Sequence, residues 1–364
     1  MIDGIIPTEI ADEPAAIRDT LAESVETARR AAAALRSRGV TRVHVIGNGT
    51  SYHSSLAAAT LYRRHALPGD PAVVALTAGE FRRYLPALGA TDAVIGISAS
   101  GEFRDVVAVV EALRGRVPIV AIVNVPGSTL DRTADYVVRS AGGPSRVPVM
   151  TKTFASTLVA TELVLAELLG GDRADRIRHA ILLAADHAEA AIASAEPLVV
   201  GLADELAGAA HLFVVGSGAA HPAALEAALK LKEMAIVHAE GTESWEMASG
   251  VATIVGADSV VIALAPDGPG HAATVDVAAH AAAWGARVIE VAPRLSIEGA
   301  TLLTIPAAAE EDHAPLTAVP PVALLAFALA RRRGQDPDHP GWVERYHSQG
   351  LRHILGAGVA GQEG

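Results

Sequence analysis

The chain carries one short glycine-containing motif twice, as V-I-G-N-G-T-S at residues 45–51 and as V-V-G-S-G-A-A at residues 214–220. Each copy ends an apolar run typical of a strand and precedes an Ala-rich run typical of a helix. A sharp glycine turn leaves backbone N–H groups at the helix start, where the unpaired donors and the helix dipole favour an anion. Only the first copy adds hydroxyl groups, at Thr50 and Ser51, because the second has two alanines there. The sequence therefore predicts one α/β unit repeated, with the anion site in the first half.

Strand-like and helix-like stretches alternate along both halves. Strands that are apolar along their whole length are typical of a parallel sheet covered by helices on both faces. We therefore expect an α/β fold with two doubly wound, flavodoxin-like sheets. The expected strands are residues 42–47, 72–76, 92–98, 117–123 and 135–139 in the first half and 211–216, 259–264, 287–292 and 301–305 in the second.

The domain organisation follows from these stretches. We expect an N-terminal domain over residues 1–195 with leading helices near 14–38, a C-terminal domain over 196–333 and a tail over 334–364. The Ala/Leu/Glu-rich residues near 152–208 are typical of long linking helices. The closely spaced prolines of the tail cannot extend a helix, so the tail is expected to wrap over another surface.

Composition limits the classes of function. With 51% hydrophobic and 4% aromatic residues, the 364 residues suit two globular domains. A net charge of −12 argues against a nucleic-acid surface. No uncharged apolar run is long enough for a bilayer and no signal peptide is evident, so no membrane partner and a cytoplasmic location are expected. The chain has no cysteine, which excludes thiolate metal sites and a cysteine nucleophile within it.

Neither a metal nor a nucleotide cofactor is expected. The 14 histidines are scattered, without the spacing of metal ligands. Gly47 and Gly49 match the first two glycines of a dinucleotide-binding turn, but Tyr52 occupies the third position and no acidic residue ends the next strand at Leu76. The glycine turn is therefore not predicted to bind a dinucleotide.

A second polar loop follows the third expected strand. Ser98-Ala99-Ser100-Gly101-Glu102 comes directly after A-V-I-G-I and before a helical run. Open α/β sheets bind ligands at the carboxyl ends of their strands, so this loop and the Thr50–Ser51 turn together would hold a phosphate through neutral hydrogen bonds. The alternative is that the serines only cap a helix.

The helix that starts near Pro222 carries three charged residues on one face. Glu226, Lys230 and Glu233 stand at i, i+4 and i+7, so two carboxylates flank one ammonium. The alternative is a solvated face of ion pairs. The acidic segment V-H-A-E-G-T-E-S-W-E follows at the expected helix end and favours a functional interpretation.

Matching stretches run almost end to end with one known family. The chain resembles sugar isomerase (SIS) domain proteins, specifically the isomerase half of glucosamine-6-phosphate synthase and stand-alone SIS-type amino-sugar-phosphate deaminases. This resemblance implies two SIS domains and a homodimer in which both chains complete each active site. The stretches that carry it are E-P-A-A-I-R-D-T-L from Glu13, G-T-S-Y-H-S from Gly49, G-E-F-R from Gly79, S-A-S-G-E from Ser98, N-V-P-G-S from Asn124, T-K-T-F from Thr151, A-L-K-L-K-E from Ala228 and H-A-E from His238.

The resemblance also implies roles for individual residues. Glu233 corresponds to the family's base, which moves a proton between C1 and C2 of an opened sugar, a task that one carboxylate performs through an enediol or enolamine. Lys230 corresponds to a lysine placed near the sugar. The positions implied to bind the sugar phosphate are Gly49, Thr50, Ser51, Ser98, Ala99, Ser100, Phe103, Pro148 and Ser249.

Several of these positions depart from the family pattern. Ala99 replaces a glutamine and Phe103 replaces a threonine, which removes two side-chain contacts to phosphate. Ser249 replaces the ring-opening histidine and cannot perform its proton transfer near neutral pH. Arg345 replaces a lysine beside the substrate and keeps the charge without forming an imine. His347 and His353 are alternative candidates for the missing acid–base group.

The expected function is therefore an aldose–ketose isomerase or deaminase that acts on an amino-sugar phosphate without hydrolysing glutamine. Two alternatives stay open. One is a fructosamine-phosphate deglycase, which uses the same C1/C2 proton transfer. The other is a sensor that binds a phosphosugar without converting it, which the loss of the histidine and the tail lysine favours.

Overall fold

The computed structural model describes residues 2–84 and 87–343. Contacts between Cα atoms divide the chain into two compact units. The first unit comprises Ala15–Leu182 and the described residues of Gly341–Gly364, and the second comprises Met1–Pro14 and Leu183–Pro340. This division falls at residue 183 and assigns the first 14 residues to the second unit. The domain bounds at residues 195 and 333 stay predictions.

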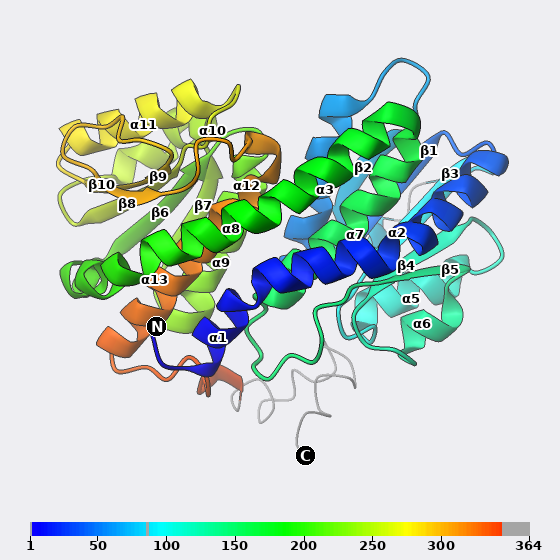
Figure 1. The fold of residues 1–364 in the computed structure, drawn as a ribbon, viewed down its shortest axis with the longest axis horizontal. Coiled ribbons are helices and arrows are strands. Elements are labelled where there is room, and N and C mark those ends of the chain that lie inside the picture. Colours follow the sequence, from blue (N-terminus) through cyan, green and yellow to red (C-terminus); the bar gives the residue numbers. More distant parts are fainter. Residues whose placement is uncertain (1, 85–86, 344–364) are drawn as a thin grey trace. The chain divides into compact units, whose positions relative to one another are not determined.

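The first unit is built on a five-stranded parallel sheet (Figure 1). Its strand order is β2-β1-β3-β4-β5. Helices α4, α5 and α6 pack on one face, around the cluster that contains Ile46, Val94 and Val110, and α3 and α7 lie on the other. The elements are α2 (Glu13–Ser37), β1 (Arg42–Gly47), α3 (Thr50–His65), β2 (Ala72–Thr77), α4 (Ala78–Arg83), β3 (Asp92–Ile97), α5 (Arg104–Leu113), β4 (Ile119–Val123), α6 (Thr129–Thr133), β5 (Tyr136–Arg139) and α7 (Lys152–Leu169).

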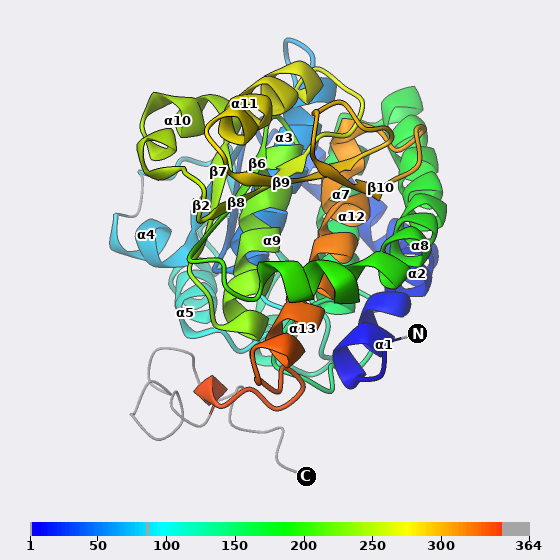
Figure 2. The same cartoon turned by 90° about the vertical axis from the view of Figure 1, so that its left-hand side faces the viewer.

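The second unit repeats this topology with the strand order β7-β6-β8-β9-β10, again all parallel. Figure 2 shows α11 on one side of this sheet and α9 and α13 on the other. The elements are α1 (Ile5–Ala11), α8 (Gly171–Leu206), which begins in the first unit, β6 (His211–Gly216), α9 (Ala220–Ala235), β7 (Ala239–Glu243), α10 (Ser244–Ser249), the 3-10 turn η1 (Val251–Ile254), β8 (Ser259–Leu264), α11 (His271–Ala283), β9 (Arg287–Ala292), β10 (Thr301–Thr304), η2 (Glu311–His313), α12 (Ala314–Thr317) and α13 (Val319–Arg332).

The two parallel sheets with flanking helices confirm the predicted fold class, and the nine predicted strands are present with ends that differ by no more than two residues. One strand was not predicted from the sequence. Residues 239–243, expected only as an acidic segment where a helix ends, form β7, which lies at the edge of the sheet and pairs, among the described residues, with β6 alone. Its sequence A-E-G-T-E is too polar to be recognised as a buried strand, because an edge strand need not be apolar on both faces.

The described part of the tail is fixed to the first helix. After α13 ends, the chain returns to α1, where the Asp338 carboxylate accepts hydrogen bonds from the N–H groups of Ile5 and Ile6 at 3.0 and 2.9 Å. Gly4 precedes this helix and has no side chain to cap it, so Asp338 performs the capping from the far end of the chain. The prediction that the tail wraps over another surface is thus confirmed for this part.

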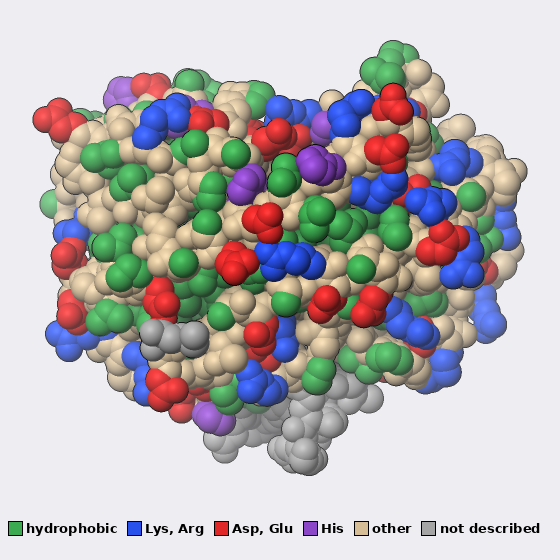
Figure 3. All heavy atoms as spheres, viewed as in Figure 1, with side chains coloured by type: hydrophobic (Ala, Val, Ile, Leu, Met, Phe, Trp, Pro, Cys, Tyr) green, Lys and Arg blue, Asp and Glu red, His purple; other side chains and the backbone are tan. Residues whose placement is uncertain are grey.

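One described stretch, residues 311–332, is long and apolar enough to cross a membrane by length and composition alone. Every residue of its most apolar window is buried, and α13 packs against α9 and α1. Such burial is typical of a core helix, so the stretch is weak evidence for a membrane span. On the face drawn in Figure 3, acidic and basic side chains are interspersed rather than gathered into areas of one sign.

Candidate functional site

The first unit places both predicted polar loops at the switch point of its sheet. β1 lies between β2 and β3, so the chain leaves β1 toward one edge of the sheet and leaves β3 toward the other. In open α/β sheets with this strand order, ligands bind at the carboxyl ends of the two strands that meet at this point. Residues 47–51 run from the last residue of β1 into α3, and residues 98–103 follow β3. We call the space that these two loops border the first crevice.

The loop after β1 is a tight turn into α3. Gly49 has a φ of 52°, which glycine adopts without strain. Gly47 is also required, because a Cβ atom there would lie 2.6 Å from the backbone carbon of Ser51. Thr50 and Ser51 form the first turn of α3 and are only 6% and 8% exposed. The turn therefore holds two hydroxyl residues at the start of a 16-residue helix, as predicted.

The serines after β3 organise their own loop. The Ser98 hydroxyl accepts a hydrogen bond from the Phe103 N–H at 3.3 Å, and the Ser100 hydroxyl accepts one from the Glu102 N–H at 3.2 Å. The two hydroxyl oxygens lie 3.4 Å apart. These bonds stay within the loop, and α5, which begins at Arg104, has no side-chain cap at its N-cap residue Phe103. A hydroxyl that accepts a bond still carries a proton that it can donate to an anion, so the loop geometry leaves the predicted binding role open.

The structure shows how the remaining predicted binding positions of the first unit are used. The Ala99 carbonyl accepts hydrogen bonds from the N–H groups of Asn124 and Val125 at 2.9 and 3.2 Å, which fixes its loop to the end of β4. Phe103 packs against the apolar cluster beneath α5 and offers no polar group. Pro148 is exposed in the loop between β5 and α7, and its binding role stays a prediction.

Asn124 is a structural residue of this edge that the sequence analysis missed. Its side-chain oxygen accepts hydrogen bonds from the Gly142 N–H at 3.1 Å and the Ser140 hydroxyl at 3.2 Å, and its amide donates to the Gly143 carbonyl at 2.7 Å. One side chain thereby holds the loop after β5 against the end of β4. An asparagine directly after an apolar strand was the available signal.

In the second unit, α9 brings the predicted charged residues together. The Lys230 ammonium lies 3.1 Å from Glu226 Oε1 and 2.7 Å from Glu233 Oε2. The solvated-face alternative is wrong for two of the three, because the side chains of Glu226 and Lys230 are 0% and 1% exposed. The Glu233 side chain is 25% exposed. Glu233 is therefore the member of the cluster that a ligand can reach, and the buried ammonium orients it.

Glu13 joins this cluster from the start of α2, which the sequence analysis did not foresee. Burial raises the pKa of Glu13 to about 8, with the Lys230 ammonium opposing the rise and the carboxylates of Glu226 and Glu9 adding to it. Although burial disfavours an ammonium, the ion pairs with Glu226 and Glu233 raise the pKa of Lys230 above its ordinary value. At neutral pH the cluster therefore holds a charged lysine and a protonated Glu13.

The end of α9 is conformationally strained. Among the described residues, Ile236 is the one non-glycine residue with a positive φ, at 52°, and it follows Glu233 by three positions. A β-branched side chain is disfavoured in this left-handed conformation. The strain ends α9 and turns the chain into β7.

Of the residues predicted at, or in place of, the family histidine and lysine, the structure describes Ser249. Ser249 is exposed in α10, where its hydroxyl donates a hydrogen bond to the Trp245 carbonyl at 2.7 Å. The Ser249 hydroxyl is therefore used in a hydrogen bond within α10. Arg345, His347 and His353 lie outside the described residues.

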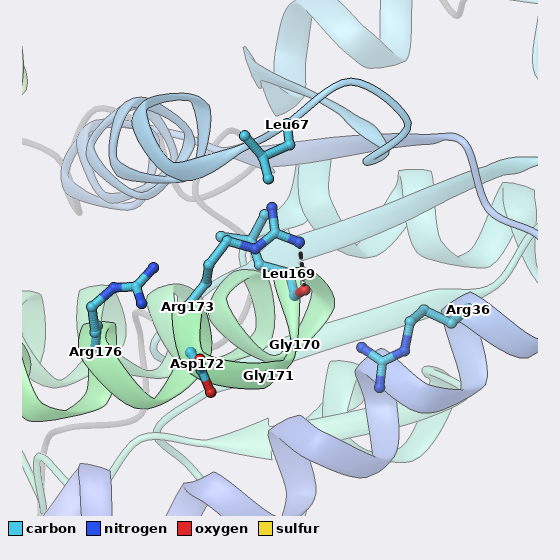
Figure 4. Close-up of a pocket in the computed structure, with 8 residues that line it drawn as sticks. All are labelled: Arg36, Leu67, Leu169, Gly170, Gly171, Asp172, Arg173 and Arg176. Atoms are coloured by element: carbon cyan, nitrogen blue, oxygen red, sulfur yellow. Dashed lines mark hydrogen bonds between the residues drawn. The ribbon is translucent and has the colours of Figure 1, made fainter.

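A surface groove of about 690 Å³ in the first unit is lined by none of the predicted site residues. Figure 4 shows the side chains that line it, which come from the ends of α2 and α7, the start of α8 and the loop after α3. The Arg173 guanidinium donates to the Leu169 carbonyl at 2.8 Å and to Asp70 at 3.1 Å. The arginine bonds in this groove hold helix ends together, so we take the first crevice in the first unit and the α9 cluster in the second as two separate candidate features.

Comparisons with known proteins agree with the fold. The sequence profile of the SIS domain family matches residues 37–167 and 205–330. Glutamine-fructose-6-phosphate aminotransferase (isomerizing) of Methanothermobacter thermautotrophicus is 33% identical over 343 residues, which cover 93% of this chain and 56% of that protein. The chain therefore spans about half the length of the curated relatives it matches.

Two solved structures show the same fold. The C-terminal domain of glucosamine-fructose-6-phosphate aminotransferase from Francisella tularensis superposes with a TM-score of 0.83 at 21% identity, over 93% of this chain and 99% of that one. Glucosamine-6-phosphate deaminase from Thermotoga maritima superposes with a TM-score of 0.75 at 20% identity, over 93% of this chain and 98% of that one.

Proposed function

Because the chain belongs to the SIS domain family, we propose that it binds a sugar phosphate at the first crevice and transfers a proton between C1 and C2 of that sugar through Glu233. The observation that carries the proposal is the α9 cluster, in which a partly exposed carboxylate is held by a buried ammonium at 2.7 Å. An ion pair that is only structural needs no exposed member, whereas a base needs one that reaches substrate.

Two features of the first crevice support the phosphate part of the proposal. Its two loops offer hydroxyl groups from Thr50, Ser51, Ser98 and Ser100 at the carboxyl ends of adjacent strands, and α3 begins at the first of these loops. A helix N-terminus and neutral hydroxyl donors suit a phosphate that must be released after each turnover. In the proposal the phosphate fixes the sugar while proton transfer takes place at its other end.

Glu233 would act as both base and acid. A carboxylate removes the proton from C2 of an open-chain aldose to give an enediol or, for a 2-amino sugar, an enolamine. The same carboxyl group then returns the proton to C1. Lys230 would orient the carboxylate, and it remains charged through the step because its pKa is raised.

The finer proposal is that the substrate is an amino-sugar phosphate. Proton transfer from C2 to C1 of such a sugar gives an imine at C2, and attack by water then releases ammonia and leaves the ketose phosphate. This deaminase reaction requires no glutamine and therefore no cysteine nucleophile. Isomerisation of a phosphosugar uses the same first steps.

A non-catalytic sensor is the second candidate, and one observation favours it. By the sequence resemblance, Ser249 corresponds to the family's ring-opening histidine, and its hydroxyl donates a hydrogen bond to the Trp245 carbonyl. A protein that lacks the ring-opening acid would bind the sugar phosphate without converting it. We also propose a homodimer in which both chains complete each active site, which sedimentation analysis of the full chain tests.

The deciding experiment incubates the full chain with glucosamine 6-phosphate and measures ammonia and ketose phosphate. We expect the wild type to release both and Glu233→Gln to release neither while still binding the sugar phosphate in a thermal-shift assay. Ser51→Ala should raise KM more than it lowers kcat, because it removes a phosphate contact. Glu246→Gln, which changes an exposed acid on α10, is the matched control.

Two results would contradict the enzyme proposal. Equal turnover by the wild type and Glu233→Gln would show that Glu233 is not the base. If sugar phosphates, including fructosamine and ketose phosphates, raised Tm and none of them was converted, the protein would be a sensor and not an enzyme.

A further inference from the structure

The second unit repeats the switch point of the first but lacks its hydroxyl groups. β6 lies between β7 and β8, as β1 lies between β2 and β3. Gly218, with a φ of 59°, follows β6 at the place that Gly49, with a φ of 52°, occupies after β1. Residues 216–220 and 265–270 border this second crevice, as residues 47–51 and 98–103 border the first.

A carboxylate of the same chain lies in the second crevice. Glu311 Oε1 accepts a hydrogen bond from the Ala219 N–H at 3.3 Å, and Glu311 Oε2 accepts one from the Gly270 N–H at 2.6 Å. Ala219 belongs to the loop after β6 and Gly270 to the loop after β8. One side chain, 4% exposed, therefore joins the two loops that meet at the switch point.

The glycines of these loops make room for this carboxylate. A Cβ atom at Gly218 would lie 1.8 Å from Glu311 Oε1, and one at Gly268 would lie 2.5 Å from Oε2. At Gly49, the corresponding position of the first crevice, a Cβ atom would have no atom outside its neighbours within 4 Å. The same turn is therefore filled in the second unit and open in the first.

The segment that carries Glu311 places the carboxylate in the second crevice. It belongs to η2, directly before α12 and α13, and α13 packs on α9 as α7 packs on α3. A second acid, Glu243, accepts a hydrogen bond from the Ser217 hydroxyl at 2.7 Å, but its other oxygen accepts the N–H groups of Trp245 and Glu246. Glu243 thus caps α10, whereas Glu311 accepts one backbone N–H from each crevice loop.

We propose that the second crevice is an oxyanion site whose ligand is the Glu311 carboxylate of the same chain. Backbone N–H groups at the starts of α9 and α11 supply the donors, as they would for a phosphate. The built-in ligand closes this unit to phosphorylated sugars and fastens the segment before α13 to the sheet. A chain would then hold one sugar phosphate of this kind and not two, although its fold is duplicated.

The test removes the carboxylate and supplies it again in solution. Glu311→Ala deletes a group that acetate or inorganic phosphate can replace, and Glu310→Ala deletes the neighbouring exposed acid as the matched control. Thermal unfolding of both full-length variants and the wild type is followed in sodium acetate, in sodium phosphate and in sodium chloride of equal ionic strength. The same measurements are repeated after Ser51→Ala is introduced into each of the three proteins. A response to the oxyanions that disappears with Ser51→Ala then belongs to the first crevice.

We expect Glu311→Ala to have a lower Tm than Glu310→Ala and to regain part of the difference in acetate or phosphate but not in chloride. Equal responses of the two variants to the oxyanions would overturn the proposal, whatever the first crevice binds. If Glu311→Ala does not fold, Glu311→Gln decides, because it keeps the volume and removes the charge. A Tm for Glu311→Gln equal to that of Glu310→Gln would then overturn the proposal.

Discussion

Replacing Lys230 by methionine tests the charged cluster on α9 most sharply. The lysine side chain is 1% exposed and lies 3.1 Å from Glu226 and 2.7 Å from Glu233, and the Glu226 side chain is 0% exposed. Methionine fills a similar volume without a charge. The substitution therefore leaves a fully buried carboxylate without its cation, and water cannot replace that partner.

The expected loss of stability is large. Removing one partner of a buried ion pair typically destabilises a protein by about 3–5 kcal/mol. For a unit of this size, that loss lowers Tm by on the order of 10 °C. The companion Lys232→Met changes an exposed lysine on the same helix, and its effect is expected to stay within about 0.5 kcal/mol.

Chemical denaturation of the two variants and of Glu226→Gln/Lys230→Met measures these values. We expect the double variant to recover part of the stability, because the amide of glutamine carries no charge that needs a cation. If Lys230→Met and Lys232→Met lowered the free energy of unfolding equally, the reasoning would be refuted, because Glu226 would then not be a buried charge that depends on Lys230.

Three further changes give predictions of definite sign. Burial raises the pKa of Glu13 to about 8 from 4.5, so its contribution to stability is fully present below pH 4.5 and is lost as the pH rises through 8. Glu13→Gln, which cannot ionise, should therefore gain stability relative to the wild type over that range in denaturation curves, and a constant difference would contradict the assignment. Ile236→Asn should raise the free energy of unfolding by about 1 kcal/mol, because asparagine tolerates the left-handed conformation that isoleucine does not; a loss of stability would show that the exposed side chain matters more than the strain. Gly101→Ala should destabilise the first unit by about 1–3 kcal/mol more than Gly143→Ala. Both glycines have a positive φ, but only at Gly101 would a Cβ atom approach Ser128 Oγ, at 2.0 Å, and equal effects on Tm would argue against this contact.

The fold could be predicted from the sequence because parallel strands are buried on both faces and therefore stand out as apolar runs. The same reasoning failed at β7, an edge strand whose residues are mostly polar. The position of the first crevice was also predictable, since each polar loop directly follows an apolar strand. The structure adds the pairing of β1 with β3, which explains why the two loops lie side by side.

The charged cluster was predictable in its spacing but not in its burial. Glu226, Lys230 and Glu233 share a helix face by periodicity alone, whereas the fact that the first two are buried depends on what packs over that face. Glu13 and Glu311 could not be assigned roles from sequence, because each meets its partners across a long separation in the chain. Local patterns carry no signal of such contacts.

The central claim is that Glu233 transfers a proton at C1 or C2 of a bound sugar phosphate. Incubation with glucosamine 6-phosphate in D₂O, followed by NMR of the recovered sugar, measures this transfer without requiring ammonia release or net turnover. The account predicts that wild-type protein introduces deuterium at C1 or C2 and that Glu233→Gln does not, although both bind the sugar. Deuterium incorporation at the same rate by both proteins, or none by a wild-type protein with the sugar bound, would contradict it.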